Sequence, residues 1–87
     1  MTDDDAVSVT VYTREECSLC ETVLDVVERV GAEYDLALSV VDVDEDPDLR
    51  EEYGERVPYV FVEGTPKFKY RVSEDAFRDA VERARRK

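Results

Sequence analysis

The segment Tyr12–Cys20 constrains the fold more than any other part of this 87-residue chain, because it places the only two cysteines where a strand should lead into a helix. Valines alternate with polar residues just before this segment, which is the two-residue period of a β-strand. They are Val7, Val9 and Val11. After Cys17, apolar residues recur at the helical spacing i, i+3, i+4 and i+7. They are Cys20, Val23, Leu24, Val27 and Val30, and we predict a helix that ends at Gly31.

The two cysteines are predicted to differ in reactivity. Cys17 falls at the helix N-terminus, where free backbone N–H groups and the positive end of the helix dipole favour a thiolate over a thiol. Cys20 lies one turn later in the apolar stripe, so it should be less exposed yet within disulfide reach. We therefore predict that Cys17 is the nucleophile and Cys20 the resolving thiol. Arg14 should add positive potential near Cys17, whereas Glu15, Glu16 and Glu21 oppose it.

The same cysteine spacing also occurs in half of a zinc or iron–sulfur site and in ordinary protein cores. Structural metal sites usually have four ligands, and this chain has two cysteines and no histidine. A metal would therefore need a second chain or carboxylate ligands, so we expect no resident metal. A metal carrier that uses the cysteine pair in a dimer stays open as an alternative.

Composition limits the location and the partners of the protein. The length fits one domain, and the acidic start Met1–Asp5, the reverse of a signal peptide, is expected to be frayed. No apolar run approaches the roughly 20 residues of a membrane span. We therefore expect a cytoplasmic protein, where a close cysteine pair is more often catalytic than structural.

The charge of the chain is strongly negative. Acidic residues outnumber basic ones 23 to 12, which gives a net charge of −11 and argues against nucleic acid as a partner. The acids are spread along the chain, as on a halophilic protein whose self-repulsion is screened by salt. An acidic face for a basic partner is the alternative.

The rest of the chain predicts three more strands and two more helices. The apolar run Leu36–Val43 indicates a strand buried on both faces, as parallel strands are. Asp46 and Pro47 suit a helix start, and Ser73 suits another. The predicted elements are a helix over Pro47–Tyr53, strands over Val57–Val62 and Lys67–Val72 joined as a hairpin, and a final helix after Ser73.

The resulting order, β-α-β-α-β-β-α, resembles the thioredoxin fold of the small glutaredoxin type, an α/β fold with a central four-stranded mixed sheet and three helices. The opening Tyr12-Thr13-Arg14, two further residues, then Cys17-Ser18-Leu19-Cys20, is similar to the glutaredoxin motif, and so is Val57-Pro58. The resemblance implies that the Val57-Pro58 bond is cis and lies beside the disulfide. It also implies that substrate contacts Tyr12, Arg14, Leu19, Val57 and Pro58.

Two departures from the glutaredoxin pattern concern the substrate. Ser18 and Leu19 replace the usual Pro-Tyr between the cysteines, and Val72-Ser73 replaces a Gly-Gly pair. Glu74 and Asp75 follow that pair and should repel the carboxylates of glutathione. We predict a monomeric thiol-disulfide oxidoreductase that needs no cofactor beyond its redox-active disulfide. Its substrates would be protein disulfides or a different low-molecular-weight thiol, its upstream reductase is not identified, and a non-catalytic adaptor module is the alternative.

Overall fold

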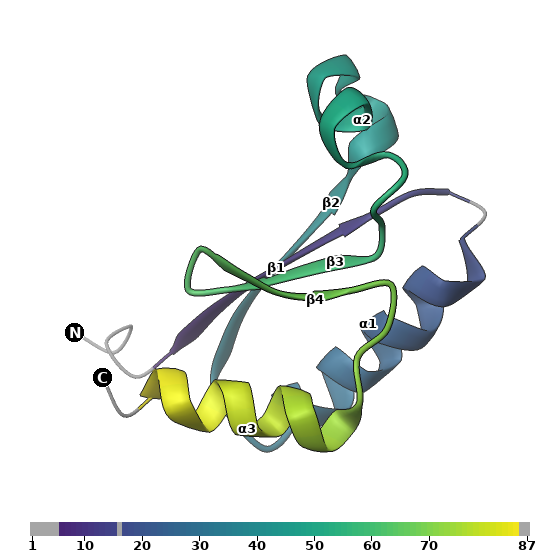
Figure 1. Cartoon of the computed structure of the whole chain (residues 1–87). Coiled ribbons are helices and arrows are strands. Elements are labelled where there is room, and N and C mark those ends of the chain that lie inside the picture. Colours follow the sequence, from purple (N-terminus) through teal and green to yellow (C-terminus); the bar gives the residue numbers. More distant parts are fainter. Residues whose placement is uncertain (1–5, 16, 86–87) are drawn as a thin grey trace.

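The computed structural model describes residues 6–15 and 17–85, so the predicted frayed end Met1–Asp5 and Glu16 lie outside it. A four-stranded mixed sheet, in the order β2-β1-β3-β4, carries three helices (Figure 1). The elements are β1 (Val7–Thr13), α1 (Ser18–Gly31), β2 (Leu36–Asp42), α2 (Pro47–Tyr53), β3 (Tyr59–Val62), β4 (Thr65–Lys69) and α3 (Glu74–Arg85). β1 runs parallel to β2 and antiparallel to β3, which is antiparallel to β4. This confirms the predicted element order and fold class.

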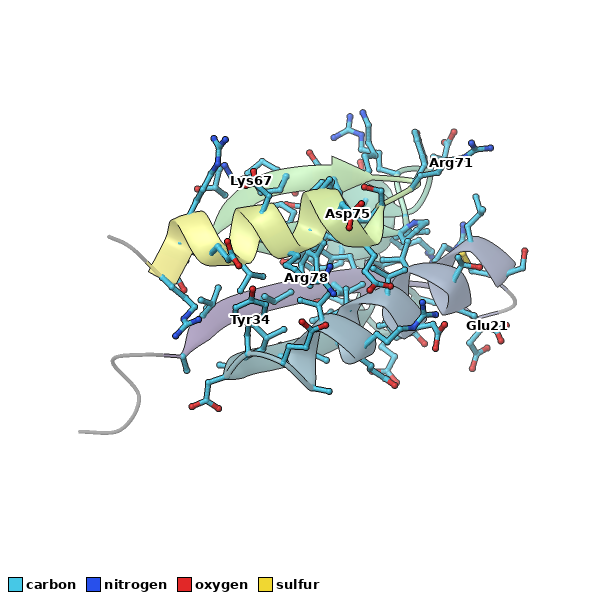
Figure 2. All side chains as sticks on the ribbon, turned by 90° about the horizontal axis from the view of Figure 1, so that it is seen from below. Glu21, Tyr34, Lys67, Arg71, Asp75 and Arg78 are labelled. Carbon is cyan, nitrogen blue, oxygen red and sulfur yellow. A yellow bond between two sulfur atoms is a disulfide. The ribbon has the colours of Figure 1, made fainter. Side chains whose placement is uncertain are left out.

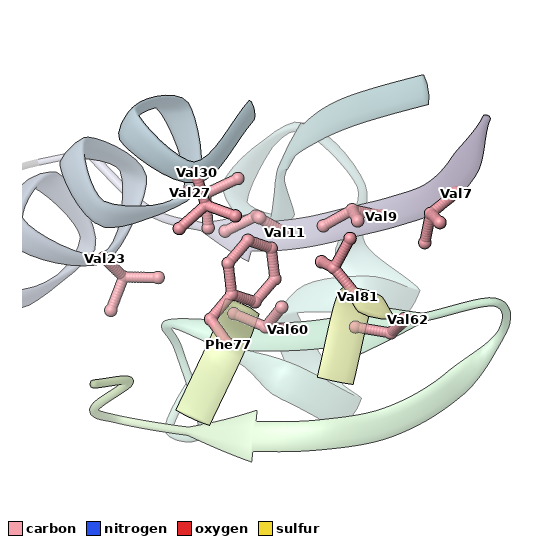
Figure 3. Close-up of a cluster of buried hydrophobic side chains, with 10 residues drawn as sticks. All are labelled: Val7, Val9, Val11, Val23, Val27, Val30, Val60, Val62, Phe77 and Val81. Atoms are coloured by element: carbon pink, nitrogen blue, oxygen red, sulfur yellow. The ribbon is translucent and has the colours of Figure 1, made fainter. Parts of the chain in front are cut away.

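The hydrophobic core lies between the sheet and the pair α1 and α3, which share one side of the sheet, whereas α2 lies on the other side (Figure 1). Alternate residues of β1 point into this core, as the two-residue period predicted, and alternate residues of β3 do so as well. Ten buried side chains form it (Figure 3): Val7, Val9, Val11, Val23, Val27, Val30, Val60, Val62, Phe77 and Val81. Burying each of these side chains stabilises the fold by about 1.5–3 kcal/mol. Most of them are valines, whose β-branched side chains adopt few rotamers, so the core beside the cysteines is rigid.

Side-chain caps start the helices where the sequence predicted. Asp46 accepts a hydrogen bond from the Asp48 amide at 2.9 Å, with Pro47 at the first helical position of α2. The Ser73 hydroxyl accepts from the Ala76 amide at 3.0 Å and starts α3. No helix in the described part of the chain is long and apolar enough to cross a membrane.

Ion pairs fix α3 against α1. Arg29 of α1 pairs with Glu74 of α3 at 2.9 Å and with Asp25 on its own helix. Arg78 of α3 pairs with Glu74 at 3.0 Å and with Glu33, after α1, at 2.6 Å. The carboxylates of Glu33 and Glu74 raise the pKa of Arg78, so this guanidinium stays charged at any physiological pH.

The prediction that the apolar run at Leu36 is buried on both faces is wrong. β2 is an edge strand that pairs with β1 alone among the described strands, and residues 37–40 are exposed. Leu38 and Val40 keep 37% and 51% of their surface accessible. The reason is the strand order: α1 and α3 cover the centre of the sheet, and β2 lies outside that cover.

The last predicted strand also ends earlier than its alternation suggested. β4 stops at Lys69, and Tyr70 turns away with a positive φ of 70°, which is uncommon for a residue other than glycine. Two hydrogen bonds hold Tyr70 there: its amide donates to the Pro58 carbonyl at 2.7 Å, and its hydroxyl donates to the Glu55 carbonyl at 3.0 Å. A tertiary contact therefore overrides the local period.

Candidate active site

The two cysteines form a disulfide at the junction of β1 and α1, with their Cα atoms 5.2 Å apart. Cys17 is the N-cap of α1: its backbone is extended, and its sulfur accepts a hydrogen bond from the Cys20 amide at 3.2 Å. The Cys17 sulfur thus occupies the place that a serine or aspartate oxygen takes at other helix starts. A sulfur in this position lies at the positive end of the helix dipole.

The two sulfur-bearing residues differ in burial, as the helical stripe predicted. Cys17 is half-buried, whereas Cys20 is only 2% exposed. Cys20 belongs to the side of α1 that packs on the sheet, and Ser18 and Leu19 between them are exposed. An incoming molecule therefore reaches Cys17 first.

A groove of about 480 Å³ surrounds Cys17. It brings together four of the residues that the sequence singled out, namely Arg14, Cys17, Leu19 and Val57. Its lining is completed by Glu15, Ser18 and Gly54. Pro58 is buried directly after Val57, and the bond between them is cis, as the resemblance implied.

Arg14 faces this groove, but its guanidinium is already engaged. The Nε atom pairs with the Asp44 carboxylate at 3.1 Å, and an Nη atom donates to the Gly54 carbonyl at 3.1 Å. These contacts tie the loop before Cys17 to the two ends of the segment that contains α2. Arg14 therefore offers less free positive charge to a ligand than the resemblance implied.

Tyr12 lies on the other face of the sheet. Its ring stacks on Tyr53 of α2 with centroids 4.6 Å apart, and the rings of Tyr12 and Phe61 are nearly perpendicular with centroids 5.4 Å apart. Burial raises the pKa of Tyr53, and the Glu52 carboxylate adds to this shift. The structure thus places Tyr12 in the aromatic cluster that anchors α2, and it is not among the residues that line the groove at Cys17.

A second, smaller groove adjoins the site and was not predicted from the sequence. It measures about 260 Å³ and is lined by Leu19, Thr22, Val23, Tyr70, Arg71 and Val72. Leu19 lines both grooves. The sequence carried no signal for this groove, because it forms only where β4 ends early and the chain turns at Tyr70.

In the part of the chain that the structure describes, metal-ligating side chains do not gather around the disulfide. Within residues 6–15 and 17–85, no three histidine, cysteine, aspartate or glutamate side chains are placed to hold a metal ion together. A cysteine pair that forms a disulfide can itself take up and release two electrons, so exchange chemistry at this site uses no separate cofactor.

A mixed sheet of this order, with a disulfide at the start of its first helix, defines a thioredoxin-fold redox protein. The model of the family named Glutaredoxin-like domain (DUF836) matches residues 8–82, and the chain belongs to this family. No curated protein matches the sequence. Family and geometry together establish a thioredoxin-like redox role for the cysteine pair.

Solved structures agree with this assignment. A mutant thioredoxin from Halobacterium salinarum NRC-1 is 31% identical, with 95% of this chain and 78% of that chain covered and a TM-score of 0.68. Protein Ne2328 from Nitrosomonas europaea is 26% identical over 86% of this chain and 91% of its own, with a TM-score of 0.71. A structural-genomics target from X. campestris has a TM-score of 0.70 at 24% identity over 87% and 97% of the two chains, which supports the fold alone.

Proposed function

We propose that the protein is a thiol-disulfide oxidoreductase in which Cys17 is the nucleophile and Cys20 the resolving thiol. The observation that carries this proposal is the Cys17 sulfur, which caps α1, accepts the Cys20 amide hydrogen at 3.2 Å and is the more exposed of the pair. In the reduced protein the same N–H group and the helix dipole stabilise a thiolate at Cys17. The thiolate is the form that attacks disulfides.

The exchange proceeds in two steps that balance. The Cys17 thiolate attacks one sulfur of the substrate disulfide, forms a mixed disulfide and releases the other substrate sulfur as a thiolate. Cys20, losing its proton, then attacks the Cys17 sulfur, re-forms the Cys17–Cys20 disulfide and releases the second substrate thiol. Two electrons pass from the dithiol to the substrate, and an upstream dithiol reductant restores the pair.

The proposed substrates are protein disulfides or a low-molecular-weight thiol other than glutathione. Arg14, which the resemblance assigned to substrate binding, is paired with Asp44 at 3.1 Å. Glu74 and Asp75 follow the turn where the family pattern has glycines. Glu74 is paired with Arg29 and Arg78, so the exposed Asp75 is the main source of repulsion for the two carboxylates of the tripeptide. Turnover of a disulfide-bonded protein should therefore exceed turnover of a glutathionylated peptide under the same reductant and salt.

We place this activity, carried out by a monomer, in a salt-rich cytoplasm. The net charge of −11 and the similarity to a Halobacterium salinarum thioredoxin support this setting. In molar salt the screening length is only about 3 Å, so like charges on the surface that lie farther apart than this repel each other little. Nucleic acid and membrane surfaces are not expected partners for so acidic a chain.

Two cysteine variants test the exchange chemistry. Cys17→Ser should abolish reduction of a disulfide-bonded test protein, whereas Cys20→Ser should stall at the mixed disulfide and trap its partner covalently in extracts of the source cells. Ser39→Ala, a change of similar size on the exposed part of β2 away from the cysteines, is the control and should retain turnover. A wild-type protein without exchange activity would point to an adaptor module, and zinc bound after purification would point to a metal carrier.

A further inference from the structure

Another groove lies between α3 and the hairpin of β3 and β4, away from the disulfide. Its volume is about 300 Å³, and none of its lining residues lines either groove near Cys17. In Figure 1 the turn of the hairpin lies over the C-terminal part of α3, at the end of the sheet opposite the start of α1. A molecule bound in this groove would therefore leave Cys17 accessible.

Short side chains on α3 open this groove. Phe77 and Val81 of α3 are buried in the core, whereas the alanines that line the groove recur every fourth residue along an adjoining face of the helix. They are Ala76, Ala80 and Ala84. An alanine side chain ends at Cβ, so the helix leaves a gap in front of the half-buried ring of Phe68 and the buried side chain of Val62. The groove thus has an apolar floor, and its volume matches the lower end of the roughly 300–1,000 Å³ of small-molecule sites.

Two carboxylates and two cations line the groove, so its rim is balanced in a chain of net charge −11. The Glu63 carboxylate accepts a hydrogen bond from the Ser8 amide at 2.6 Å, and Asp79 pairs with Arg83 at 3.0 Å. Lys67 is exposed, and among the described residues its ammonium group forms no ion pair. Figure 2 shows Lys67 on β4 beside α3. The rim therefore keeps one cation for a ligand, next to the apolar floor.

We propose that this groove binds a small amphipathic carboxylate, with its aliphatic tail against Val62, Phe68 and the alanines and its carboxylate at Lys67. Burial of the tail supplies most of the affinity. The ammonium group of Lys67 orients the ligand through a charge-assisted hydrogen bond. This site is separate from the exchange function proposed above and does not depend on it.

Hexanoate, hexylammonium and acetate test this proposal on the oxidised protein in about 0.1 M salt, by titration of backbone amide chemical shifts in NMR spectra. Hexanoate should give saturable shifts of the Phe68 and Ala80 amides, with a dissociation constant on the order of 1–10 mM, as expected for a ligand of about eight heavy atoms. Hexylammonium has the same tail and the opposite charge, and it should bind about two- to fivefold more weakly, the range for one exposed charge interaction. Acetate lacks the tail and should cause no saturable shifts there. Because a net charge of −11 disfavours any anion, a preference for hexanoate requires a local cation.

Two pairs of variants separate the groove from the rest of the surface. Lys67→Gln should remove the preference for hexanoate, whereas Lys69→Gln, which removes the other exposed lysine of β4, should keep it. Ala80→Leu fills the groove and should raise the dissociation constant of hexanoate by about tenfold or more. Ala32→Leu adds the same side chain at an exposed position after α1 and should leave this constant unchanged. If thermal unfolding shows that Ala80→Leu does not fold, Ala76→Leu blocks the exposed end of the groove instead.

Three results would overturn the proposal. The first is equal or tighter binding of hexylammonium to the wild type, which would mean that Glu63 and Asp79 select a cation. The second is an unchanged preference for hexanoate in Lys67→Gln. The third is unchanged hexanoate binding in the leucine variant that blocks the groove, which would mean that the ligand binds elsewhere. Disulfide exchange plays no part in these measurements, so their failure would leave the exchange function untouched.

Discussion

Replacing Arg14 by alanine should destabilise the protein through the loop before Cys17. The Arg14–Asp44 pair is partly exposed, with side-chain accessibilities of 40% and 27%, so it contributes about 0.2–1 kcal/mol. The hydrogen bond to the Gly54 carbonyl has a charged donor, for which about 1.5–3 kcal/mol is typical, and its partial exposure favours the lower value. We expect Arg14→Ala to lower the free energy of unfolding by about 2 kcal/mol.

Asp44→Ala separates the two contacts, because it removes the ion pair and leaves the bond from Arg14 to Gly54. Its cost should stay below about 1 kcal/mol. For a domain of this size, each kcal/mol corresponds to about 4–8 °C in melting temperature, so the two variants are distinguishable by thermal unfolding of the oxidised proteins. Urea unfolding gives the free energies directly.

The reasoning would be refuted if Arg14→Ala were as stable as the wild type, or if Asp44→Ala cost as much as Arg14→Ala. The same variant also tests the role of Arg14 at the site. Because the guanidinium is held by Asp44 and Gly54, its loss should change turnover of a protein disulfide and of a glutathionylated peptide by similar factors. A selective loss with the glutathionylated peptide would show that Arg14 binds the tripeptide.

Iodoacetamide should label Cys17 of the reduced protein well before Cys20, because Cys17 is more exposed and lies at the helix N-terminus, whereas Cys20 is 2% exposed. Mass spectrometry of partly labelled protein checks this, and equal labelling would reverse or cancel the assigned roles. The melting temperature should rise between low and molar salt, because screening relieves repulsion within a chain of net charge −11. A flat or falling melting temperature would favour an acidic recognition face instead.

The features that the sequence predicted correctly are those set by neighbouring residues. Alternating valines define β1, and the stripe that includes Cys20 defines the buried side of α1. Asp46 and Ser73 accept hydrogen bonds from amides two and three residues away, so their caps can be recognised locally. The half-buried Cys17 and the buried Cys20 follow from the same helical period.

The features that were missed depend on distant partners. A run of apolar residues is compatible with a central strand and with an edge strand, and only the strand order places Leu38 at the edge. Tyr70 leaves β4 because its amide and its hydroxyl donate hydrogen bonds to the segment before β3. Arg14 forms its ion pair with Asp44, which lies thirty positions away in the sequence. The second groove depends on Tyr70, so it was hidden for the same reason.

The central position of β1 has a consequence for how the molecule opens. β1 pairs with β2 on one side and β3 on the other, so its amide hydrogens should exchange with solvent only when the whole domain unfolds. The amide hydrogens of the exposed residues of β2 should exchange through local openings that require less free energy than global unfolding. Protection should therefore drop sharply within the few residues between Thr13 and Cys17. Cys17 lies on that boundary, so exchange chemistry at its sulfur should leave the slowest-exchanging part of the protein undisturbed.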